Sequence, residues 1–142
     1  MTPEQKEKLL ALFARNKLGV VSTVSAEGKP QSAVVAISET SELCLVFGSF
    51  KGNRKNNNIE RNPAVSVVVG WSDDDSTTVQ MEGKTQFLEG EERERLADAH
   101  CKKEDSYEYH KDPRQQYFKI IPTWIRYSDF SIDPQEIWEL NF

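Results

Sequence analysis

The chain has 142 residues, a length typical of one domain and sufficient for a hydrophobic core without disulfide or metal support. Apolar residues make up 37% and charged residues 29%, which excludes a disordered chain, and the net charge of -5 argues against a general nucleic-acid binder or a protein held on anionic lipid. We therefore expect a single domain spanning residues 1–142.

The first predicted element is a helix that ends near Asn16. Thr2 is a plausible N-cap, Pro3 suits the first helical position and Gln5 completes a capping box. The apolar residues that follow, within 9–13, form one face. These first residues contain no apolar run of the kind found in signal peptides, and no stretch approaches the ~20 apolar residues of a membrane span.

Strand-like segments dominate the rest of the chain. They are separated by tight turns rather than by crossover helices, which indicates antiparallel pairing. We predict strands at 18–25, 31–38, 43–47, 64–71, 77–88, 117–127 (broken by Pro122) and 137–142, and helices at 53–61 and 91–103. This pattern favours a mainly β fold, a closed or partly closed antiparallel barrel with peripheral helices.

A basic segment, residues 51–61, interrupts this acidic chain. It contains four cations and one anion, a net charge of +3, so the remainder carries -8. If Asn53 caps the helix, then Arg54 and Lys55 lie in its first turn and oppose the helix dipole. A bound phosphate would reverse the sign of that interaction, and Ser49 would add a hydroxyl donor.

The segment has three interpretations: an inert solvated loop, a phosphate site or an RNA-contacting loop. The net charge weakens the last. We expect no metal site, because His100 and His110 lack further ligands at fitting spacing and are interpreted as surface histidines. Cys44 and Cys101 lack CxxC spacing, so we expect two free thiols in a reducing, cytoplasmic compartment.

The run VFGSFKGNRKNNNIERNPAVSVVV resembles the signature of the pyridoxamine 5'-phosphate oxidase-like flavoproteins, the FMN-binding split barrels. The preceding GVVSTVSAEGKPQSAVVAI resembles the first hairpin of that fold. The ending YFKIIPTWIRYSDF...EIWELNF is most similar to the general stress protein branch. The resemblance implies an antiparallel split β-barrel of about six strands and a homodimer with FMN at the subunit interface.

The resemblance also implies particular cofactor-binding residues. Ser49, Arg54 and Lys55 would hold the phosphate, and Gly48 would contribute backbone. Residues of two strands would complete the site: Gln31, Ser32, Ala33 and Val34 running past the flavin ring, and Thr78 or Gln80 contributing from the neighbouring strand.

The chain departs from the true oxidase at three places. The strand that begins with Arg and ends with Lys in the oxidase has Gln31 and Ala36 here, and the chain stops at Phe142 where the oxidase continues to an Arg-Leu-His motif. Oxidation of pyridoxamine phosphate is therefore not expected. The leading hypothesis is a flavin-dependent oxidoreductase of unknown substrate.

Three alternatives remain open at this point. The first is a non-catalytic flavin-binding or stress-related module. The second keeps the fold but binds haem or a deazaflavin. The third is a dimeric interaction domain whose basic loop is empty. We expect no nucleic-acid or membrane partner under any of them.

Overall fold

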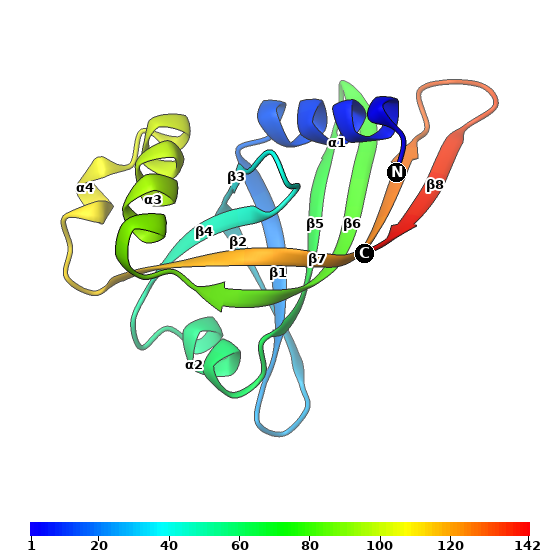
Figure 1. Cartoon of the computed structure of the whole chain (residues 1–142). Helices are drawn as coiled ribbons and strands as arrows, with labels where there is room; N and C mark the ends of the chain where they lie inside the picture. Colours follow the sequence, from blue (N-terminus) through cyan, green and yellow to red (C-terminus); the bar gives the residue numbers. More distant parts are fainter.

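A computed structural model describes residues 1–142 and shows one curled, antiparallel eight-stranded sheet (Figure 1). The strand order is β2-β1-β5-β6-β7-β4-β3, with β8 paired to the far part of β7. The strands are β1 (Leu18–Val24), β2 (Pro30–Ala36), β3 (Ser38–Glu39), β4 (Leu45–Phe50), β5 (Ala64–Ser72), β6 (Asp75–Phe87), β7 (Gln115–Asp129) and β8 (Glu136–Asn141). The predicted split β-barrel is confirmed, and the very short β3, which was not predicted as a separate strand, brings the number of strands to eight.

Four helices lie around this sheet: α1 (Pro3–Arg15), α2 (Arg54–Arg61), α3 (Gly90–Glu104) and α4 (Tyr107–His110). The predicted capping box of α1 is present, because Thr2 accepts from the backbone of Gln5 and Gln5 accepts from Thr2. Figure 1 shows α1 across one end of the sheet and α2 near the opposite end. The α3–α4 pair lies to the side, beyond β4.

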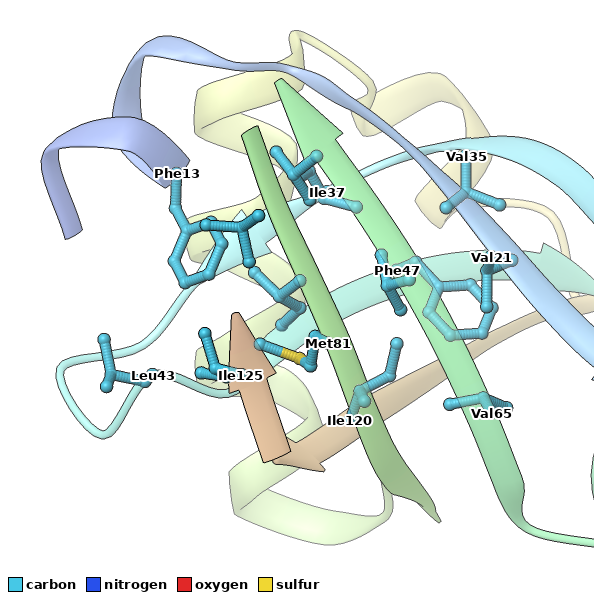
Figure 2. Close-up of a cluster of buried hydrophobic side chains, with 14 of the residues drawn as sticks. Phe13, Val21, Val35, Ile37, Leu43, Phe47, Val65, Met81, Ile120 and Ile125 are labelled. Atoms are coloured by element: carbon cyan, nitrogen blue, oxygen red, sulfur yellow. The ribbon is translucent and has the colours of Figure 1, made fainter. Parts of the chain in front are cut away.

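The concave side of the sheet encloses the core (Figure 2). Alternation along the strands produces it, since period-two side chains point to opposite faces. In β5, Val65, Val67 and Val69 are buried, and in β6 Val79 and Met81 are buried. Apolar side chains of α1, including Phe13, close one end of this core.

The long strand β7 differs from its prediction. Pro122 does not break it: the strand continues through Pro122 with a register shift opposite Glu82 and Gly83. A proline has no N–H to donate to the ladder, so it is tolerated where a bulge interrupts the pairing. β7 can therefore pair with β6 over residues 118–129, while its other edge pairs first with β4 and then with β8.

Candidate functional site

A cleft runs between the edge of β2 and the N-terminus of α2, and continues to the end of α3. It consists of two adjoining cavities of about 330 and 160 Å³ that share Asn53 and Lys55. The smaller is lined by β2 and by the start of α2. The larger is lined by residues 34–36 of β2, residues 48–50 of β4, and side chains of α3, α4 and β7.

The N-terminus of α2 forms the basic wall of this cleft. The first-turn N–H groups of a helix have no intrahelical acceptor, and no side chain caps them here. Arg54 and Lys55 lie in that turn, which contains no acidic residue, and the ion pairs of the chain involve other residues. Burial lowers the pKa of Lys55. Two unpaired cations and free N–H groups thus face one position, an arrangement that favours an anion.

Asn53 occupies the N-cap position but does not perform the capping role that its residue type predicts. Its amide Nδ2 donates to Ser49 Oγ at 3.3 Å instead of its oxygen accepting from α2. Ser49 is buried at the cleft wall, and because its oxygen accepts from Asn53, its hydroxyl hydrogen stays available for a ligand.

Two buried asparagines, Asn56 and Asn58, hold α2 in place, although the sequence had predicted no role for them. Asn56 Nδ2 donates to the Ser49 carbonyl at 3.2 Å and to Gln116 Oε1 at 2.9 Å. Asn58 Nδ2 donates to Thr23 Oγ1 at 3.0 Å and to Gln31 Oε1 at 2.8 Å. The sequence contained a signal for this role, since Ile59 is the only apolar residue among the eight residues of α2 and polar side chains must supply the other anchors.

Gly48 lines the cleft, and its missing side chain is also required by the packing of the neighbouring strand. Its backbone is not in the left-handed region, and a Cβ added to it would lie 2.2 Å from Gln115 Nε2 on the paired strand β7. The missing side chain therefore makes room for Gln115, which itself lines the cleft. Gly52, by contrast, has a φ of +92° and is required by the turn that precedes α2.

The prediction of a surface histidine at position 100 is wrong. His100 is 4% exposed, and its Nδ1 lies 3.0 Å from Ser38 Oγ. Burial, with the charge of Lys103 as a smaller cause, lowers the pKa of His100 to about 4. Both His100 and Glu104 line the cleft, as do Ser106 and Tyr109, and none of these four had been assigned to the site. The sequence predicted a helix at 91–103, but tertiary packing determines which face of this helix lines the cleft.

The remaining predicted residues divide into two groups. Gln31, Ser32, Ala33 and Val34 line the cleft together with Gly48, Ser49, Arg54 and Lys55. Thr78 and Gln80 do not. Thr78 Oγ1 donates to the Val69 carbonyl, and Gln80 is exposed on the outer face of β6, opposite Val68 of β5.

Cys44 and Cys101 are both free thiols, as predicted, and both are buried. No three His, Cys, Asp or Glu side chains gather as potential metal ligands. None of the four helices has the length and apolar character needed to cross a membrane.

A curled antiparallel sheet with peripheral helices, and with a basic cleft at the N-terminus of α2, defines a protein of the split-barrel class. Within that class, residues 5–129 match the sequence pattern of the family "Pyridoxamine 5'-phosphate oxidase". The chain belongs to this family. A curated relative, the pyridoxine/pyridoxamine 5'-phosphate oxidase of Ehrlichia ruminantium, is 36% identical over 76 residues. That alignment covers 54% of the chain and only 39% of the relative's length.

Two solved structures are similar in both sequence and fold. The putative pyridoxamine 5'-phosphate oxidase of Listeria innocua is 26% identical, with a TM-score of 0.74 over 87% of this chain and 97% of that one. The General Stress Protein 26 of Bacillus anthracis is 27% identical, with a TM-score of 0.71 over 96% and 99%.

More distant structures share the fold alone. A pyridoxamine 5'-phosphate oxidase-related, FMN-binding protein of Nostoc punctiforme is 12% identical, with a TM-score of 0.70 over 100% of this chain and 97% of that one. A haem-binding protein of Mycobacterium smegmatis is 16% identical, with a TM-score of 0.83 over 99% and 59%. The fold by itself therefore does not choose the ligand.

Proposed function

We propose that the chain is an FMN-binding flavoprotein that acts as a flavin-dependent oxidoreductase. The observation that carries this proposal is the wall formed by Arg54 and Lys55, two unpaired cations beside uncapped N–H groups. Without an anion, each cation costs about 0.3–1 kcal/mol against the helix dipole, and a bound phosphate reverses that term. Family membership and the FMN-binding neighbour support the choice of FMN.

The cleft suits the rest of FMN as well. Its phosphate would bind Arg54, Lys55 and the Ser49 hydroxyl, and its ring would lie along residues 31–34 of β2 beside Gly48. When bound, FMN supplies two-electron redox chemistry, and the protein supplies orientation and electrostatics. In the larger cavity, Val34 and Ala36 form an apolar stretch of one wall. The buried free thiols support a reducing compartment, the cytoplasm.

We propose further that two copies form a dimer through the outer face of the sheet. Val34, Val20 and Val68 are direct cross-strand neighbours on β2, β1 and β5, and are 65%, 38% and 46% exposed. A row of exposed valines of this kind favours a second copy rather than water. Val34 also lines the cleft, so the interface would adjoin the cofactor. Thr78 and Gln80, which do not reach the cleft of their own chain, would then contribute to the partner's.

The test is a titration of the purified protein with FMN and with riboflavin, followed by flavin fluorescence. We expect FMN to bind, and the double variant Arg54→Ala/Lys55→Ala to weaken FMN on the order of 100-fold while leaving riboflavin nearly unchanged. The charge-matched control Lys29→Ala/Lys51→Ala removes two exposed cations from outside the cleft and should leave FMN binding unchanged. Equal loss of both ligands in the first variant would contradict the phosphate assignment.

The same preparation separates the alternatives. Reduction of bound FMN by NADH or NADPH supports the oxidoreductase, whereas bound FMN that neither nucleotide reduces favours a non-catalytic module. A Soret band in the visible spectrum would identify haem instead. A colourless protein that binds neither flavin would leave a dimeric interaction domain.

A further inference from the structure

The far end of the cleft is acidic, in contrast to the basic wall on α2. His100 and Glu104 are four residues apart on α3, so they lie on the same face of the helix, and both line the larger cavity. Lys55 lines the same cavity from α2. The cavity therefore has an unpaired cation on one wall and a carboxyl group on another.

Glu104 has no partner within the chain. It makes no ion pair, and its Oε1 is buried without any hydrogen bond. The adjacent Lys103 is already bound, to Glu39 Oε2 at 2.6 Å and to the Phe13 carbonyl at 2.8 Å. Burial raises the pKa of Glu104, which means that the site disfavours an unpaired negative charge.

The position of Glu104 in its helix further disfavours a negative charge on its side chain. Glu104 is the last residue of α3, where the helix dipole is negative and a cation would be preferred. Lys103 and Lys17 are near enough to lower the pKa of Glu104, but burial outweighs them and neither lysine forms an ion pair with it, so no direct contact within the chain explains the buried carboxyl group. A positively charged ligand would offset all of these costs at once.

His100 supplies a neutral neighbour for such a ligand. Its Nδ1 is fixed by Ser38, its ring lies edge-on to Tyr117 with centroids 6.0 Å apart, and no protein group is bonded to its Nε2. With its pKa lowered to about 4, the imidazole adds no positive charge at neutral pH that would repel a cation. It can accept or donate one hydrogen bond according to its tautomer.

We propose that His100 and Glu104 bind a protonated amine, so that the molecule that shares the cleft with FMN belongs to the class of amines, and anions are excluded from this end. The inference rests on the proposed function, since FMN is taken to occupy the basic end. A carboxylate facing the cavity would also repel a phosphorylated substrate, which agrees with the expectation that pyridoxamine phosphate is not oxidised.

The test compares benzylamine, benzyl alcohol and benzoate, which share a planar ring and differ in charge. Calorimetry and the change in the flavin spectrum measure binding to the FMN-loaded protein. We expect benzylamine to bind at least about tenfold more tightly than benzoate, with benzyl alcohol between them. Glu104→Gln should weaken benzylamine by about 10- to 100-fold, and Glu104→Lys should reverse the preference towards benzoate.

The control is Glu108→Gln, which removes an exposed carboxylate on α4 that does not line the cleft. It should leave the amine preference intact. Benzoate binding as well as benzylamine, an unchanged preference in Glu104→Gln, or no benzylamine binding at all would overturn the proposal.

The experiment distinguishes failure of the proposed function from failure of the inference about the amine. All variants are first titrated with FMN, and Glu104→Gln should bind FMN as the parent does. If the parent itself binds no FMN, the same three probes are titrated against the protein alone by calorimetry. In that case, a preference of the FMN-free protein for benzylamine that is lost in Glu104→Gln supports the inference about His100 and Glu104. The absence of either result overturns it.

Discussion

Asn58 of α2 donates its side-chain amide to Gln31 Oε1 of β2 across 2.8 Å, and this bond joins the helix that carries the two cleft cations to the strand on the other side of the cleft. Asn58 is 2% exposed and also donates to Thr23 Oγ1, while Arg61 donates to its Oδ1. The spacing between α2 and β2 at the basic end of the cleft therefore depends on this buried side chain.

Replacing Asn58 by alanine should destabilise the protein by about 2–3 kcal/mol, because it leaves the buried Thr23 and the half-buried Gln31 without their shared donor. Urea denaturation measures the change. The matched control is Asn57→Ala, at an exposed position next to it whose amide makes only a 3.4 Å contact with the Gly52 carbonyl. We expect a change below about 0.5 kcal/mol there. Similar losses at the two positions would show that Asn58 is not the anchor.

Gly48 should not tolerate a side chain while Gln115 keeps its position. The added Cβ of Gly48→Ala would lie 2.2 Å from Gln115 Nε2, so the long side chain must move, at a cost of about 1 kcal/mol or more. Gln115→Ala should remove that cost. A double-mutant cycle on the free energy of unfolding should therefore give a favourable coupling between the two substitutions. Strict additivity would mean that Gly48 is needed for another reason.

The stability of the protein should fall as the pH is lowered towards 4. In the unfolded chain, the imidazole of His100 takes up a proton near pH 6.5, whereas burial delays this in the folded protein to a pKa of about 4. The unfolded state therefore binds more protons between these values. The free energy of unfolding decreases across that window, by up to roughly 3 kcal/mol from this group.

His100→Gln tests that assignment. The variant cannot take up the proton, so the difference in stability between parent and variant should change between pH 7 and pH 4 by the contribution of His100. Urea denaturation at a series of pH values measures it. A difference that stays constant over the whole range would assign the acid sensitivity to other groups.

A charge on the outer face of the sheet should separate the proposed dimer. Val68 is 46% exposed and lies at the β5 end of the valine row, so Val68→Glu would bury a carboxylate against the second copy. Light scattering should report a monomer for this variant. Ile132→Glu is the control, since Ile132 is 47% exposed but lies in the loop after β7, away from the row. A parent that is itself monomeric would refute the dimer.

Some of the site was already determined by local sequence. Thr2, Pro3 and Gln5 specify the start of α1 through short-range hydrogen bonds, and the alternation in β5 and β6 specifies which side chains are buried. The basic helix start was likewise predictable from the Arg-Lys pair between a strand and an Asn-Pro turn. Arg54 and Lys55 are adjacent in the first turn of one helix and therefore lie close together.

Only the tertiary structure decided what faces this basic segment. His100 and Glu104 are about fifty residues away in sequence, and the thin apolar stripe of their helix did not indicate that its last turn closes the cleft. The roles of Gly48 and of Asn56 and Asn58 depend on side chains from β7, β1 and β2. The basic end of the cleft thus follows from contiguous residues, whereas its acidic end follows from packing between distant elements, which no local pattern encodes.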